Sequence, residues 1–133
     1  IKPETLIQLI NTHESNNALA SLISADLMDP SGYGRIIKNN KNQLIKIVEH
    51  KDASKEERKI NEINSGIYIF NSKIIKNIIP KINNDNAQNE YYLTDIFNFI
   101  NETDTSIYKI KNFNEIAGIN TISQLNELEK NIS

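Results

Sequence analysis

Cysteine and tryptophan are absent from this chain of 133 residues, which has one methionine, three prolines and four glycines. Without cysteine the chain can form neither a disulfide nor a thiolate metal site, and two histidines do not make a structural zinc site. No apolar run approaches the ~20 residues of a membrane span, and no secretory pattern opens the chain. Charges of both signs are interspersed to a net charge of −2. The composition therefore predicts one modest globular domain, with neither a membrane nor a nucleic acid as its partner.

What the sequence does contain is a succession of strand-like and helix-like segments. Runs of apolar and β-branched residues predict strands over residues 19–27, 35–38, 44–50, 63–70 and 105–111. The asparagine-rich stretch 39–42 predicts a hairpin because asparagine tolerates turn dihedrals. Residues 105–111 alternate as in an exposed edge strand. This mixture indicates an α/β fold with a mixed rather than purely parallel sheet.

Helices are predicted between the strands from apolar spacing and from residues that cap or break helices. They cover residues 3–13, a short charged segment after Ser54, residues 72–79, residues 91–100 and a segment that begins at a capping box of Thr121 and Gln124. The first helix has a predicted apolar face of Leu6, Ile7, Leu9 and Ile10. We expect His13 and His50 at the surface, because neither has a partner at catalytic spacing.

Four short polar segments lie at or near the ends of the predicted strands, at residues 32–35, 48–52, 62–68 and 118–120. Ligands of open α/β sheets bind just beyond the carboxyl ends of strands. Together the segments offer a carboxylate, two carboxamides and a bare glycine backbone, a set that suits a sugar phosphate. We therefore expect them to converge in one polar pocket.

Three of these segments supply the first candidates. Gly34 has no Cβ, so a ligand could reach its backbone N–H, and a turn glycine is the alternative. Glu49 could accept hydrogen bonds from two vicinal sugar hydroxyls, and a solvated charge paired with Lys51 is the alternative. Asn64 and Ser65 interrupt an apolar strand, where a polar group costs free energy unless it is satisfied. For this pair a ligand is the favoured partner.

Two further positions support a ligand site. Gly66 would let a ligand approach the backbone closely. Asn120 offers a carbonyl oxygen of the kind that Mg²⁺ accepts beside phosphate, and an asparagine that merely begins a helix is an equal alternative. The sequence shows no Ser-His-Asp or Cys-His arrangement and no Walker-type phosphate loop.

In this order and spacing the segments resemble the sugar-1-phosphate nucleotidyltransferases, and most closely the uridylyltransferase domain of the bifunctional bacterial enzymes that make UDP-N-acetylglucosamine. The stretches that carry the resemblance are residues 29–36, 47–53, 62–68, 86–95 and 118–120. It implies a three-layer, Rossmann-like α/β fold with a mixed sheet. Residues 1–133 would be the C-terminal, sugar-binding part of that domain.

The resemblance also implies a role for each candidate. The backbone N–H of Gly34 would bind the sugar nucleotide, Glu49 would hold sugar hydroxyls, and Asn64 would bind the sugar or its phosphate-bearing side. Asn120 would be a ligand of a catalytic Mg²⁺ and would also touch the sugar of the nucleotide. The wall facing the acetamido sugar would be formed by Glu90, Tyr92 and Thr94.

The implied reaction is transfer of UMP from UTP to N-acetylglucosamine-1-phosphate, which gives UDP-N-acetylglucosamine and pyrophosphate in the cytoplasm. No general base is needed, because a phosphate dianion is already a nucleophile near pH 7. The family's glycine-rich nucleotide loop, uracil-reading segments and Mg²⁺-binding aspartate have no counterpart in these 133 residues. The hexapeptide repeats of the acetyltransferase β-helix are also missing. We therefore expect the chain by itself to be inactive.

Several alternatives remain open at this point. The chain could serve another sugar-1-phosphate or another base, it could be a non-catalytic sugar-nucleotide-binding fragment, or it could be an interaction module without a ligand. Self-association or a complementing N-terminal segment would cover an exposed strand edge. The family's glycine before Glu90 is Asn89 here, and asparagine can adopt the left-handed conformation that such a position requires.

Overall fold

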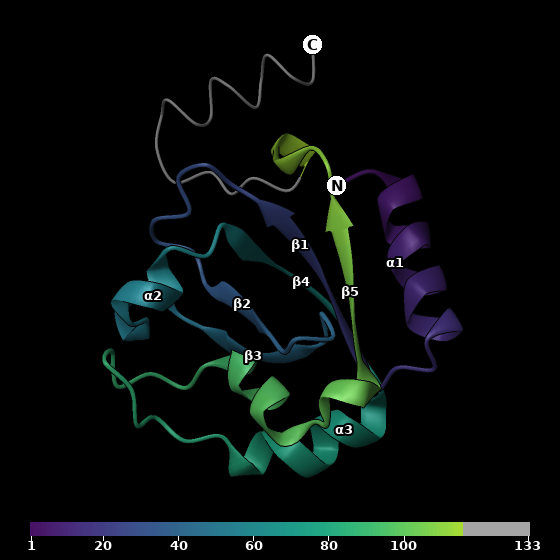
Figure 1. Cartoon of the computed structure of the whole chain (residues 1–133). Helices are drawn as coiled ribbons and strands as arrows, with labels where there is room; N and C mark the ends of the chain where they lie inside the picture. Colours follow the sequence, from purple (N-terminus) through teal and green to yellow (C-terminus); the bar gives the residue numbers. More distant parts are fainter. Residues whose placement is uncertain (116–133) are drawn as a thin grey trace.

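The structure is a computed structural model that describes residues 1–115 (Figure 1). In this part the helices are α1 (Pro3–Ser15), α2 (Lys55–Arg58) and α3 (Ser72–Ile78). The strands are β1 (Ala20–Asp26), β2 (Arg35–Lys38), β3 (Leu44–Val48), β4 (Glu62–Phe70) and β5 (Thr105–Ile110). The candidate Asn120 and the predicted capping box at residues 121–124 lie outside the described residues.

The strands form one sheet in the order β3-β2-β4-β1-β5. Strand β5 runs parallel to β1, whereas the β1–β4, β2–β4 and β2–β3 pairs are antiparallel. The predicted mixed sheet is thus confirmed, as is the position of the last strand at an edge. Each predicted strand overlaps an observed one, because apolar β-branched runs pack well on a pleated, half-buried surface.

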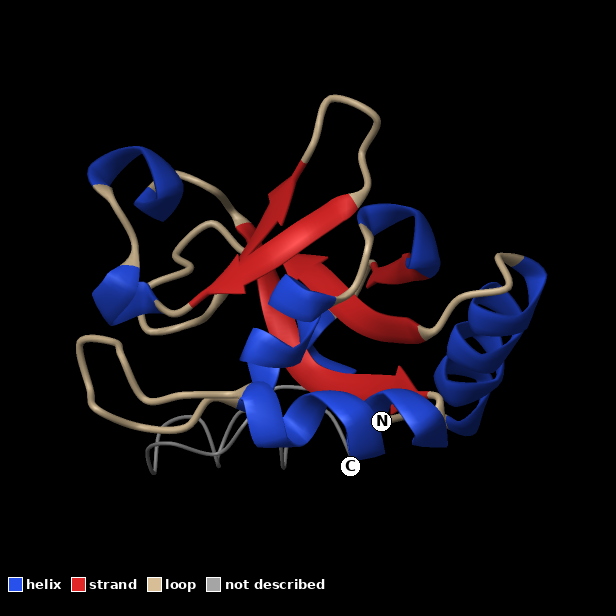
Figure 2. Ribbon diagram, turned by 90° about the horizontal axis from the view of Figure 1, so that it is seen from below, coloured by secondary structure: helices blue, strands red, loops and turns tan. Residues whose placement is uncertain are grey.

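Helical segments lie on both faces of the sheet, with the strands through the middle of the molecule (Figure 2). Helix α1 packs on one face, over a core of Leu9, Ile23, Ala25, Ile63 and Ile110. The other face carries a larger core that takes Ile78 from α3 and Ile96 and Phe97 from the 3-10 helix η3 (Leu93–Phe99). The expected three-layer α/β arrangement is therefore present.

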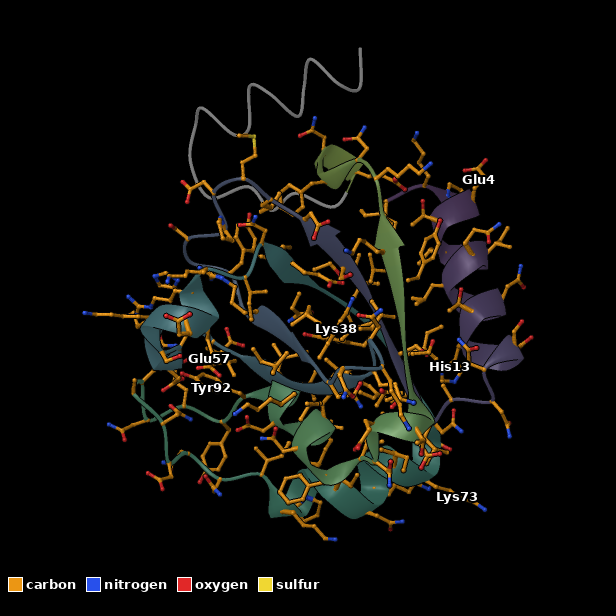
Figure 3. All side chains as sticks on the ribbon, viewed as in Figure 1. Glu4, His13, Lys38, Glu57, Lys73 and Tyr92 are labelled. Carbon is orange, nitrogen blue, oxygen red and sulfur yellow. The ribbon has the colours of Figure 1, made fainter. Side chains whose placement is uncertain are left out.

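Strands β2 and β3 form the predicted hairpin, with Asn42 in the left-handed region at φ 62°. The hairpin joins the rest of the sheet through one register pair, Arg35 with Ile63. An ion pair between Lys38 Nζ and Glu62, 2.6 Å long, adds a side-chain link (Figure 3). Ile36, Leu44 and Ile47 of the hairpin are also buried in the larger core, and the residues at the base of the hairpin carry the site described below.

Helix α1 buries a face that differs from the predicted one. Thr5, Leu9 and His13 are buried, whereas Leu6, Ile7 and Ile10 are 39–54% exposed. His13 Nδ1 lies 2.6 Å from Ser21 Oγ, and Nε2 lies 3.0 Å from Asn71 Oδ1. The prediction that His13 is a surface residue was wrong, because hydroxyl and carboxamide groups on the sheet side satisfy its ring nitrogens (Figure 3). The same contact uses the Asn71 side chain, which makes no hydrogen bond to cap α3.

In place of the α-helix predicted over residues 91–100, the structure has the 3-10 helix η3 (Leu93–Phe99). A 3-10 helix has three residues per turn, so residues three apart share a face. Thr94, Phe97 and Ile100 follow this spacing and are all buried, whereas Leu93 is 48% exposed. Thr94 is thereby turned toward the end of β3, where Glu49 lies.

Candidate functional site

Three candidate residues lie at one level of the sheet: Gly34 just before β2, Glu49 just after β3 and Asn64 as the third residue of β4. Arg35 pairs with Val48 on β3 and with Ile63 on β4. Since both pairings are antiparallel, Gly34 has Glu49 on one side and Asn64 on the other. The backbone N–H of Asn64 donates to the carbonyl of Gly34 at 2.9 Å. We call Gly34, Glu49 and Asn64 the strand row, and its role in binding a ligand stays a prediction.

Gly34 is buried at the centre of the strand row. A Cβ on this residue would lie 3.1 Å from Ile47 Cγ2 and 3.4 and 3.5 Å from the two carboxylate oxygens of Glu49. Glycine is needed here because the side chains of Ile47 and Glu49 occupy the space that a Cβ would need. The absence of a side chain at Gly34 thus lets Ile47 and the Glu49 carboxylate pack against its backbone.

Glu49 is half-buried and is held by a side chain from η3. The hydroxyl of Thr94 donates to Glu49 Oε1 at 3.2 Å. Burial raises the pKa of Glu49, the Thr94 hydrogen bond lowers it, and the charges of Asp52 and Asp95 raise it further, for a net increase. Because water solvates this half-buried carboxylate poorly, hydrogen bonds from ligand hydroxyls would stabilise its charged form.

Asn64 begins a bulge in β4. Opposite the single residue Ile23, strand β4 has three residues, 65–67, between the pairs Leu22–Tyr68 and Ser24–Asn64. The Asn64 side chain accepts from the N–H of Gly66 at 3.0 Å, and Ser65 Oγ accepts from the N–H of Ile67 at 3.1 Å.

The bulge changes the interpretation of two residues. Ser65 satisfies the backbone of the bulge, so its polar group has a partner without a ligand. Gly66 has φ +85°, a left-handed backbone that favours glycine with or without a ligand, and close approach of a ligand there stays a prediction. Asn64 still has an amide proton to offer, because its NH₂ group has two.

The polar loop before η3 is hydrogen-bonded to the segment that follows β3. Asp52 accepts from the N–H of Ala87 at 2.7 Å, and Gln88 Nε2 donates to Tyr92 Oη at 2.7 Å. Asn89 has φ 53°, which confirms that asparagine takes the left-handed position. Tyr92 and Thr94 are thus placed near Glu49, whereas Glu90 is exposed and is held through its backbone by Asn86.

A hollow of about 360 Å³ lies between β3 and this loop. Glu49 and Tyr92 line it, and Figure 3 shows Tyr92 beside Glu57 at its rim. The acidic lining residues are Glu49, Asp52, Glu57, Asp85 and Asp95, against one lysine, Lys46. Burial first, with the charge of Asp52 second, raises the pKa of Asp95. The hollow therefore suits hydroxyls and repels phosphate.

Arg35 is a positioning residue that the sequence did not single out. It is 1% exposed, and its guanidinium donates to the carbonyls of Tyr33, Arg58 and Ile60 and contacts His50 Nδ1 at 3.2 Å. Burial, and then the charge of Arg58, lowers its pKa. Its only signal in the sequence is that it follows Gly34. Through these contacts Arg35 holds residues 50–60 in place beside the strand row.

Within the segment that Arg35 holds, helix α2 begins after the predicted cap. The cap at Ser54 is confirmed, since Ser54 Oγ accepts from the N–H of Glu57 and Glu57 accepts from that of Ser54.

In residues 1–115 no group of three or more histidines or carboxylates could hold a metal ion. Nor is any helix within this range long and apolar enough to cross a bilayer.

Comparison with known proteins identifies the family. The family model described as nucleotidyl transferase matches residues 1–116. The chain belongs to the nucleotidyl transferase family. The fold agrees: a Bacillus anthracis protein assigned as a glucose-1-phosphate thymidylyltransferase, solved with sucrose, superposes with a TM-score of 0.64. That match covers 91% of this chain and 46% of the other at 20% identity, so it supports the fold alone.

The bifunctional protein GlmU of several bacteria is similar to this nucleotidyl transferase chain. Identity is 44% over 131 residues for Alkaliphilus oremlandii, 45% over 130 for Clostridium botulinum and 42% over 132 for Streptococcus mutans. These matches cover 97–98% of this chain but only 28–29% of each relative. The chain thus spans less than a third of the length of the curated relatives it matches.

Proposed function

We propose that this chain supplies the sugar-binding part of a sugar-1-phosphate nucleotidyltransferase domain. In the complete domain the reaction would transfer UMP from UTP to N-acetylglucosamine-1-phosphate and release pyrophosphate. The GlmU relatives, at 42–45% identity, support this choice among the reactions of the family. The cytoplasm is the expected compartment, because both substrates are made there.

The observation that carries the proposal is the strand row. Gly34, Glu49 and Asn64 come from segments far apart in the sequence, and the sheet register sets them side by side. A hexose has hydroxyls that donate to a carboxylate and oxygens that accept from N–H groups. The row offers one carboxylate, one carboxamide donor and one glycine backbone to such a ring.

Charge suggests how the ligand would lie. The hollow beyond Glu49 is lined by five carboxylates and one lysine. A phosphate there would be repelled by these carboxylates. We therefore propose that uncharged parts of the sugar, including its acetamido group, face Tyr92 and Thr94. The phosphate would point away from Asp52, Asp85 and Asp95.

The nucleotide and the cofactor enter the proposal through the family. Mg²⁺ would neutralise phosphate charge when bound, and Asn120 is the residue proposed to hold it. The residues of this chain would act by binding and orienting the sugar phosphate for in-line attack, with no covalent intermediate on the protein. Because these 133 residues contain no glycine-rich nucleotide loop, we expect them alone not to catalyse the transfer.

A second candidate is a protein that binds a sugar nucleotide without taking part in transfer, since groups such as Glu49 and Asn64 can hold a sugar whether or not transfer follows. The two candidates differ when the missing part of the domain is supplied as a separate polypeptide. Pyrophosphate release that appears only in the mixture supports the enzyme, and binding without release supports the second candidate.

A titration calorimeter tests the sugar site itself. N-acetylglucosamine-1-phosphate, glucose-1-phosphate and UDP-N-acetylglucosamine are titrated into the wild-type chain and the Glu49→Gln and Glu56→Gln variants. Glu56 is exposed on α2 and serves as the charge-matched control. We expect binding to the wild-type chain. Glu49→Gln should weaken it at least tenfold, and Glu56→Gln should leave it unchanged. Equal affinities of the two variants would refute the site.

A further inference from the structure

Tyr68 lies where the bulge in β4 ends, and the bulge brings it to Asn64. In a regular strand, residues four apart are separated by about 13 Å. Here the three residues 65–67 stand opposite Ile23 alone, so β4 is shortened between Asn64 and Tyr68. As a result Asn64 Nδ2 donates to Tyr68 Oη at 2.6 Å.

The orientation of the Asn64 carboxamide is fixed at both ends. Its oxygen accepts from the N–H of Gly66 at 3.0 Å, and its nitrogen faces the Tyr68 hydroxyl. A flipped amide would set its NH₂ group against the N–H of Gly66, two donors face to face. Asn64 therefore uses its carbonyl on the bulge and one amide proton on Tyr68. One amide proton remains for a ligand.

The Tyr68 ring is held firmly enough to act as this support. Its centroid lies 5.4 Å from that of Phe70, with the rings stacked, and 6.0 Å from that of Phe97. Burial raises the pKa of Tyr68, the Asn64 hydrogen bond opposes this, and the negative charge of Glu49 adds to it. The phenol thus stays neutral at physiological pH.

We propose that Tyr68 is the positioning residue of Asn64, and that it makes Asn64 a donor toward the ligand. The carbonyl oxygen already accepts from the N–H of Gly66, and the amide proton that Tyr68 does not use would meet a hydrogen-bond acceptor of the ligand, such as a ring, hydroxyl or phosphate oxygen. This inference rests on the proposed function for the identity of the ligand. The orientation of Asn64 is a property of the chain without ligand.

The test separates orientation from binding. Tyr68→Phe keeps the stacked ring and removes the hydroxyl, and Tyr108→Phe on β5 is the matched control. Nuclear magnetic resonance follows the side-chain amide signals of Asn64 without ligand, and calorimetry follows N-acetylglucosamine-1-phosphate. We expect Tyr68→Phe to move those amide signals and to weaken binding about two- to tenfold, while Tyr108→Phe does neither.

Two further measurements keep the proposal open to refutation if Tyr68→Phe folds poorly. In the wild-type chain, nuclear Overhauser contacts must join the Asn64 NH₂ protons to the Tyr68 ring. Asn64→Asp keeps an oxygen that the Tyr68 hydroxyl can meet but removes the donor, so it must weaken binding more than Tyr68→Phe does.

Absent Overhauser contacts, amide signals unmoved in folded Tyr68→Phe, or unchanged affinity of that variant would each overturn the role of Tyr68. If no sugar phosphate binds the wild-type chain, the proposed function fails, and the amide signals still decide whether Tyr68 orients Asn64.

Discussion

Replacing Gly34 by alanine tests whether the bare backbone at the centre of the strand row matters. The added Cβ would lie 3.1 Å from Ile47 Cγ2 and 3.4 Å from the nearer carboxylate oxygen of Glu49. Ile47 is 4% exposed and β-branched, so it cannot easily turn aside. Either β2 and β3 move apart by a few tenths of an ångström at this point, or the Ile47 side chain shifts by that much, and the Glu49 carboxylate beside it is displaced.

The expected loss of stability follows from opposing effects. Overpacking a core site costs about 1–3 kcal/mol, and replacing glycine recovers about 0.4–1 kcal/mol from the unfolded chain. The net loss is about 1 kcal/mol. At about 2.1 cal/mol/K per residue, the unfolding entropy of 133 residues is about 0.28 kcal/mol/K. Gly34→Ala should therefore lower the melting temperature by about 4 °C.

Gly32→Ala is the matched control, since it lies two residues away and has no Cβ clash. Its φ of +85° makes alanine strained, at about 1–2 kcal/mol. Thermal unfolding by circular dichroism should thus show a comparable fall for both variants. Binding of N-acetylglucosamine-1-phosphate should fall at least tenfold in Gly34→Ala and stay unchanged in Gly32→Ala. If both variants bind alike, the strand row is not the site.

Three other perturbations have definite expected outcomes. Since the pKa of Glu49 is raised above its unfolded value of 4.5, its ionised form destabilises the fold. Glu49→Gln should therefore have a higher melting temperature than wild type at pH 7. This difference in melting temperature should disappear below about pH 4.5, where Glu49 is protonated in both states. A difference that persists at pH 4 would contradict this. Thr94→Val should raise the pKa of Glu49 further, followed by carboxyl carbon resonances, and an unchanged or lower pKa would disprove the Thr94 contact. Arg35→Met leaves three backbone carbonyls without their donor and should cost about 3 kcal/mol in urea unfolding, whereas a loss under 1 kcal/mol would show that the guanidinium is dispensable.

Much of the fold could be predicted because its signals are local. A run such as residues 63–70 favours a strand wherever it lies, and Ser54 caps a helix with a partner three residues away. The left-handed turns at Asn42 and Asn89 are equally local, since asparagine tolerates that conformation by itself. The rule about carboxyl ends of strands did not place the strand row, because Gly34 precedes β2 and Asn64 lies near the start of β4. Antiparallel register sets the three residues level, and of the three only Glu49 is among the residues that line the hollow.

Other features depend on partners that no local pattern specifies. The burial of His13 requires Ser21 and Asn71, which is 58 residues away in sequence. The bulge that joins Asn64 to Tyr68 exists because β4 is paired with a β1 that has fewer residues in the same interval. Arg35 is buried because four separate acceptors surround it.

The sequence by itself thus determined the strands, the cap at Ser54, the turn asparagines and the set of polar residues offered to a ligand. Tertiary structure alone decided which of those polar groups are satisfied within the chain, as for Ser65 and His13. It also decided which keep a donor or charge available, as for Asn64 and Glu49. The physical reason is that propensity acts over a few residues, whereas hydrogen-bond satisfaction and burial depend on neighbours that only folding brings together.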